Sequence, residues 1–170
     1  MTRASLTLIL LLAAPPAIAG DADCKAVLDA VVKQAGVPVH QKMEIESSQA
    51  RGRKMQSEIV RTADALYMQI NGQWHKRPYD PARTVADAQE AMRKSAHTCT
   101  LVRRDSVNGQ AADLYKVHSE GAQGTSDAEV WLSVADGLPL RQHTQMTPPG
   151  GAPMRHDVTY DYGNVKAPIP

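Results

Sequence analysis

The sequence contains no phenylalanine among its 170 residues, and only two tryptophans and five tyrosines. With so few bulky rings, a closed eight-stranded barrel is hard to fill, because interior side chains pack such barrels. A sheet curved around a helix or a cavity suits this composition better. Charge of one sign is not in excess either, since 19 Lys and Arg residues stand against 18 Asp and Glu. This balance argues against nucleic acid as a partner and against strong attraction to anionic membranes.

Motifs of common catalytic sites are absent as well. The chain has no G-x-S-x-G nucleophile elbow, no H-E-x-x-H zinc motif and no glycine-rich phosphate loop. No cysteine lies beside a histidine in the pattern of a thiol enzyme. We therefore expect a protein that is not an enzyme and that needs no cofactor.

The N-terminus has the pattern of a secretory signal. Arg3 precedes an apolar run from Leu6 to Ala14, and the small residues Ala17 and Ala19 predict cleavage after Ala19. The run is too short for a bilayer core, which needs about 20 apolar residues. Cys24 follows acidic residues rather than the small apolar ones of a lipid-attachment site. We expect a signal peptide over 1–19 and a soluble periplasmic protein that is not a lipoprotein.

The remaining residues, 20–170, have the length of a single domain and, once Arg3 is removed, balanced charges. They contain two cysteines, Cys24 and Cys99. In an oxidising compartment such a pair usually forms a disulfide. Metal-binding or reactive thiols are the competing interpretation, but the C-x-x-C spacing typical of many such sites is missing.

Two segments have helical spacing. Apolar residues recur every three or four positions over 23–35, and Gly36 follows. A second helix begins at Asp80-Pro81, with Asp as N-cap and Pro at the first helical position, and ends near Ala96. The disulfide would join the first helix to the end of the second.

The rest of the chain alternates in the manner of strands. Asn71-Gly72 and Asn108-Gly109 are typical of type I′ hairpin turns, and Asp136-Gly137 predicts a third turn. The polar segment 120–126 predicts a loop, and 147–151 a turn. We expect an α+β domain with about eight strands in a curved antiparallel sheet. The sheet would form a half-open barrel, with both helices packed on its concave face.

Several segments, taken together and in order, resemble the LolA-like superfamily. They are Tyr67–Lys76, Val107–Val117, Val130–Arg141 and Tyr160–Val165. This superfamily comprises periplasmic lipoprotein carriers and relatives, among them mycobacterial lipid-binding lipoproteins and a sigma-factor regulator. The similar region covers about residues 42–168. The resemblance implies a half-open barrel closed by helices, which binds a lipid or acyl chain on its concave side.

Apolar residues at alternating strand positions, with two from the second helix, are candidates for the lining of such a cavity. They serve equally well as a packed core, and the sequence does not separate the two. We expect binding of a lipid, an acyl chain or another apolar ligand. The alternative is an envelope protein-interaction or sensing module, using Trp131 or an edge strand. The candidate lining residues are Ile45, Ile59, Met68, Ile70, Val85, Met92, Leu101, Leu114, Val130, Leu132 and Leu140.

A third hypothesis concerns copper. His143, Met146, Met154 and His156 flank the Pro148–Gly151 turn, and the two methionines could face each other across a hairpin. Thioether and imidazole ligands suit copper. The simpler interpretation is that the methionines are ordinary hairpin residues and the histidines are solvated.

Overall fold

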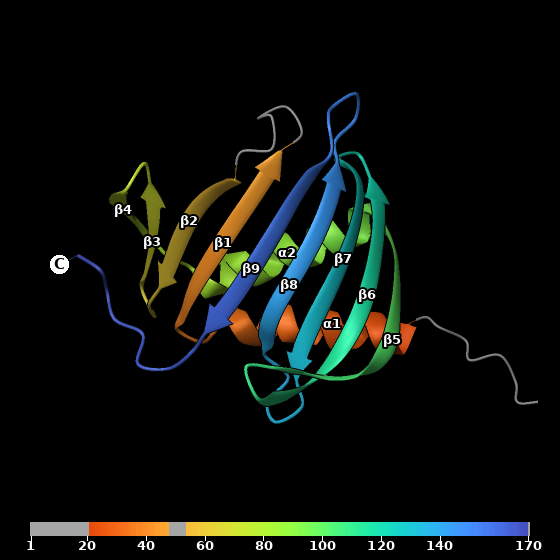
Figure 1. The fold of residues 1–170 in the computed structure, drawn as a ribbon, viewed down its shortest axis with the longest axis horizontal. Coiled ribbons are helices and arrows are strands. Elements are labelled where there is room, and N and C mark those ends of the chain that lie inside the picture. Colours follow the sequence, from red (N-terminus) through yellow and green to blue (C-terminus); the bar gives the residue numbers. More distant parts are fainter. Residues whose placement is uncertain (1–20, 48–53, 170) are drawn as a thin grey trace, which may run out of the picture.

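The computed structural model describes residues 21–47 and 54–169 (Figure 1). The expected signal peptide lies outside these residues. None of the described helices is long and apolar enough to cross a membrane. The elements are α1 (Asp21–Ala35), β1 (Val39–Ser47), β2 (Lys54–Arg61), β3 (Ala65–Ile70), β4 (Gln73–Pro78), α2 (Pro81–Lys94), β5 (Ala96–Val107), β6 (Gln110–Gly121), β7 (Gly124–Ser133), β8 (Pro139–Thr147) and β9 (Met154–Asp161).

The strands form one antiparallel sheet in the order β4-β3-β2-β1-β9-β8-β7-β6-β5. Nine strands are described, where the sequence predicted about eight. The sheet curves but does not close, so β4 and β5 are its edges, and both helices lie on the same face (Figure 1). The predicted α+β class, with a half-open barrel and helices on its concave side, is therefore confirmed.

The two Asn-Gly turns have the backbone that the sequence predicted. Asn71 and Gly72 have φ of 52° and 79°, and Asn108 and Gly109 have 51° and 81°. A type I′ turn needs positive φ at both central residues, which Asn and Gly adopt at little cost. These turns fix the β3–β4 and β5–β6 hairpins.

The predicted loop over 120–126 is wrong. Strands β6 and β7 continue through it and pair up to Gly121 and Gly124, so only two residues remain for the turn. Gly124 makes this possible, because its φ is 105° and a Cβ there would lie 2.1 Å from the Thr147 carbonyl oxygen. The polar composition of the segment reflects exposed strand ends rather than a loop.

Helix α1 is fixed at both ends. The predicted Cys24–Cys99 disulfide is confirmed and joins its first turn to the fully buried Cys99 of β5. At its C-terminal end, the buried Arg61 guanidinium donates to the carbonyls of Gln34 and Val37. Because the last carbonyls of a helix lack internal partners, a buried cation is well placed there.

Helix α2 begins as predicted, with the Asp80 side chain accepting from the backbone N–H of Arg83 at 3.1 Å. It ends at Lys94, two residues before the predicted end. None of its residues is buried, and it packs mainly on α1 and β5. Its apolar stripe, which includes Val85 and Met92, is only half-buried.

Candidate ligand-binding site

A cavity of about 210 Å³ lies between α1 and the concave face of the sheet. Its wall on the helix side is made by three apolar residues and Gln34. On the sheet side, apolar residues alternate with small polar ones. The lining residues are Val27, Ala30, Val31, Gln34, Val117, Ser119, Ser126, Ala128, Val130, Leu132, Pro139, Gln142 and Tyr160.

Three of the polar residues that line this cavity, Gln34, Gln142 and Tyr160, are hydrogen-bonded. The Tyr160 hydroxyl donates to Oε1 of Gln142 at 3.1 Å. Burial raises the pKa of Tyr160 to about 12, so the phenol is neutral at physiological pH. Gln34 donates to the Tyr162 hydroxyl at 3.3 Å, and Tyr162 donates to the Pro139 carbonyl at 2.7 Å. The cavity is therefore an apolar space with a neutral, hydrogen-bonded end.

Strand register extends this apolar surface beyond α1. Met43 is paired with Val158, Val158 with Gln142, and Gln142 with the cavity residue Val130, so all four lie on the concave face. Because side chains alternate along a strand, the same argument places all the remaining methionines of the strands on the concave face, together with Ile45 and Ile59. We call this group of apolar residues the methionine wall: Met43, Ile45, Met55, Ile59, Met68, Met146 and Met154.

The methionine wall is only partly covered. Among the described residues none of its members is buried, and Met55 is 56% exposed. Ile70, on the same face at the β3–β4 end, is 44% exposed. An apolar surface thus runs from the cavity under α1 towards the β4 edge of the sheet.

The structure separates the predicted lining residues into groups. Val130 and Leu132 line the cavity, and Ile45, Ile59, Met68 and Ile70 lie on the same face beyond it. A ligand role for any of them remains a prediction.

Leu114 and Leu101 do not fit the expected lining. Leu114 is fully buried but pairs with Trp131, so it lies on the face opposite Val130. The sequence favoured the concave face for Leu114, because Leu114 and its neighbour Tyr115 are both apolar enough to lie there. In the structure Tyr115 takes the concave position and packs against α1. Leu101 pairs with Tyr115 and so lies on the concave face, but it is outside the cavity, on the edge strand β5, and 45% exposed. Leu140 is buried beside the irregular β7–β8 pairing, also outside the cavity.

Sequence reasoning missed the small and polar half of the lining. Ala128, Ser126 and Ser119 shape the cavity, yet only large apolar residues were selected as candidates. Their positions carry a usable signal, because Ser126 and Ala128 precede Val130 at intervals of two and so share its face. Small residues at such positions leave the space that larger ones would fill.

Trp131 lies on the convex face and is half-buried. Its indole N–H donates to Asp105 at 3.1 Å, and the Arg141 guanidinium lies 5.4 Å from its ring centroid. The indole N–H and the ring face of Trp131 are therefore both in contact with other residues of this chain. This favours packing within the chain over a partner contact.

The four predicted copper ligands do not come together. Met146 and Met154 are cross-strand partners, as predicted, and His156 shares their face. His143 lies on the convex face, where its Nδ1 is 3.0 Å from Asp157 Oδ1. The four-residue site is therefore wrong, because residues 143 and 146 are an odd number of positions apart on β8. Among the described residues, no three His, Cys, Asp or Glu side chains are grouped for a metal.

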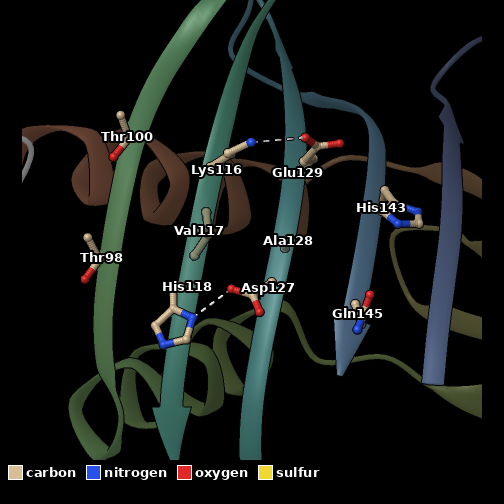
Figure 2. Close-up of a pocket in the computed structure, with 10 residues that line it drawn as sticks. All are labelled: Thr98, Thr100, Lys116, Val117, His118, Asp127, Ala128, Glu129, His143 and Gln145. Atoms are coloured by element: carbon tan, nitrogen blue, oxygen red, sulfur yellow. Dashed lines mark hydrogen bonds and ion pairs between the residues drawn. The ribbon is translucent and has the colours of Figure 1, made fainter. Parts of the chain in front are cut away.

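The convex face differs in chemistry from the concave face. Figure 2 shows a hollow on this face, spread across β5 to β8 and open to solvent. Its charged groups pair across strands, His118 with Asp127 at 2.7 Å and Lys116 with Glu129 at 3.9 Å. Exposed pairs of this kind add little stability, and the side chains that line the hollow are mostly polar or charged. The concave face is the better candidate site.

Comparison with known proteins supports the fold. No protein-family model matches the chain, and no curated protein matches it. A structure of MucB matches with a TM-score of 0.53 and 19% identity, covering 88% of this chain and 62% of that one. The Pseudomonas aeruginosa MucA/MucB complex matches with a TM-score of 0.54 and 16% identity, covering 87% and 59%. This chain thus spans about three fifths of the MucB chains.

The matching structures also include a LolA superfamily protein, NE2245 from Nitrosomonas europaea. That match has a TM-score of 0.26 and 9% identity, and it covers 81% of this chain and 90% of the other. At these identities the comparisons describe architecture. The chain has the fold of MucB: an open antiparallel sheet with helices across its concave face.

Proposed function

We propose that this protein is exported to the periplasm and binds an apolar ligand, a lipid or acyl chain, on the concave face of its sheet, without catalysis. The observation that carries the proposal is the continuous apolar surface formed by the cavity under α1 and the methionine wall. Methionine side chains adapt to ligands of varied shape, because they are unbranched and polarisable.

The size of the cavity under α1 limits what it can hold alone. Its 210 Å³ is below the roughly 300–1,000 Å³ of typical small-molecule sites. A longer chain would have one part under α1 and the rest along the methionine wall. Helix α2, which has no buried residue, is placed to cover that second part at little cost to its own packing.

Export is supported by two features. The pattern over residues 1–19 is typical of a signal peptide, and a disulfide between elements 75 residues apart suits an oxidising compartment. MucB, whose fold the chain shares, has been solved with the segment MucA(peri). These features agree with a periplasmic location.

The test is native mass spectrometry of protein purified from its own periplasm, with displacement of a fluorescent fatty acid. We expect a co-purified lipid and probe binding. Ser126→Phe fills the cavity and should weaken probe binding about tenfold or more. Its control is Thr125→Phe, on the same strand but the opposite face, which should leave binding unchanged. Absence of both lipid and probe binding would overturn the proposal.

A second candidate function is binding of a protein partner. It is favoured by the MucA/MucB complex and by the lack of any buried residue in α2. A pull-down that recovers a stoichiometric partner, with a purified protein that carries no lipid, would support it over ligand binding.

A further inference from the structure

Met146 and Met154 form the last cross-strand pair of β8 and β9 before the turn that joins them. Both are half-buried on the concave face, at one end of the methionine wall. Directly opposed residues in an antiparallel pair have Cβ atoms roughly 4.5–5.5 Å apart. Two thioether sulfurs can therefore approach one ion placed between the strands.

His156 lies on the same face, two residues after Met154 on β9. It is diagonal to Met146, at a spacing that long side chains bridge. Its direct cross-strand neighbours are Thr144 on β8 and Ile45 on β1. The His156 imidazole therefore lies on the same concave face as the two methionine sulfurs.

His156 differs from most of the other histidines in its hydrogen-bond and ion-pair partners. Four of the six are engaged, His40 with Glu58, His97 with Ser119, His118 with Asp127 and His143 with Asp157. Within the described part of the chain, His156 has no hydrogen-bond or ion-pair partner. It is half-buried, whereas the other unpartnered histidine, His75, is exposed.

On β1 and β9, the carboxylates nearest to this point of the sheet lie on the other face. Glu44, Glu46 and Asp157 are one residue out of phase with the concave positions, so they lie on the convex face. The strand positions that flank the three residues on the concave face are neutral: Ser126 beside Met146, Ser47 beside Met154, and Thr144 and Ile45 beside His156. Soft sulfur and imidazole donors without carboxylates favour Cu(I) over Zn²⁺ or Mg²⁺.

We propose that Met146, Met154 and His156 bind one Cu(I) ion through two thioether sulfurs and one imidazole nitrogen. The site overlaps one end of the proposed ligand surface, since Met146 and Met154 belong to both, but Cu(I) binding does not require a bound lipid. It does not include His143, which lies on the convex face of the same hairpin.

The experiment is an anaerobic titration of the purified protein with Cu(I) alone, against a chromophoric Cu(I) chelator. The Cys24–Cys99 disulfide is kept intact and checked by a thiol assay, because free thiolates would themselves bind Cu(I). We expect one equivalent bound more tightly than about micromolar. X-ray absorption should show sulfur neighbours together with nitrogen. Weaker binding than this, or a spectrum without sulfur, would overturn the proposal.

Variants locate the site. Met146→Leu, Met154→Leu and His156→Asn should each weaken Cu(I) binding about tenfold or more, and Met→Leu nearly conserves side-chain volume. The matched controls are Met68→Leu, elsewhere on the wall, and His143→Asn, on the other face of the hairpin. Equal weakening by the controls would contradict the assignment. Fatty acid probe binding, measured on the same variants, separates failure of this site from failure of the proposed function.

Discussion

Helices α1 and α2 lie over the same face of the sheet but are held there in different ways. Ala30 and Ala35 of α1 are buried, and Ala30 packs on Tyr115, Val130 and Leu132. Helix α2 has no buried residue. Small residues let α1 approach the sheet closely, and this close approach both forms one wall of the cavity and fixes the helix.

The charges of α2 are satisfied within the helix itself. Glu90 pairs with Arg93 and Lys94, three and four residues further on, and Arg83 approaches Asp87. Such exposed pairs add little stability and do not bind the helix to the sheet. Helix α1 is therefore a fixed part of the fold, and α2 is the helix over the concave face that opens at the lower free-energy cost.

Among the changes that test how firmly each helix is held, loss of the disulfide should lower the free energy of unfolding most. Replacing Cys24 and Cys99 together by Ser frees the first turn of α1 from β5, across a separation of 75 residues. The chain-entropy model gives a loss of roughly 4–5 kcal/mol in the free energy of unfolding, and measured losses are often smaller. Urea denaturation of the double variant and the oxidised wild type measures it. A loss below about 1 kcal/mol would mean that packing alone fixes α1.

Truncation of one apolar side chain under each helix gives a more direct comparison. Leu132→Ala, beneath α1, should lower the free energy of unfolding by about 2–5 kcal/mol, since it removes buried methyl groups and enlarges the cavity. Met92→Ala on the half-buried stripe of α2 should cost below about 1 kcal/mol. Chemical denaturation of both variants tests the pair. Equal losses would show that α2 is packed as firmly as α1.

The smallest effect is expected at alkaline pH. The pKa of Tyr160 is raised to about 12 from 10, so an unfolded chain releases this proton before the folded one does. Stability is therefore fully present below pH 10 and falls as pH rises towards 12, by at most about 2.7 kcal/mol for two units. Tyr160→Phe should reduce that fall when unfolding is followed between pH 9 and 11.5. An unchanged slope would mean that water reaches the hydroxyl under α1.

Much of the fold could be predicted from local patterns. The Asn-Gly turns, the Asp80-Pro81 helix start and the cysteine pair each depend on neighbouring residues or on a simple count, and all three agree with the structure. The failures lie where alternation is ambiguous. Leu114 and Tyr115 are both buried on opposite faces, and a pattern of period two does not say which of them faces α1.

The candidate site was less accessible to sequence reasoning. His143 and His156 flank the same turn. His143 is three positions from Met146 along β8, whereas His156 is two positions from Met154 along β9, so the two histidines lie on opposite faces of the sheet. The cavity itself depends on Ser126 and Ala128, whose small size has meaning only once α1 lies above them.

The sequence by itself determined the class of the fold, the positions of its two Asn-Gly turns and the disulfide. These depend on local backbone preference and on the pairing of two cysteines. The tertiary structure alone decided which face α1 closes, how little α2 is buried, and which methionines and histidine share one surface. Those features depend on strand register and on contacts between segments far apart in the chain, and no local preference fixes either.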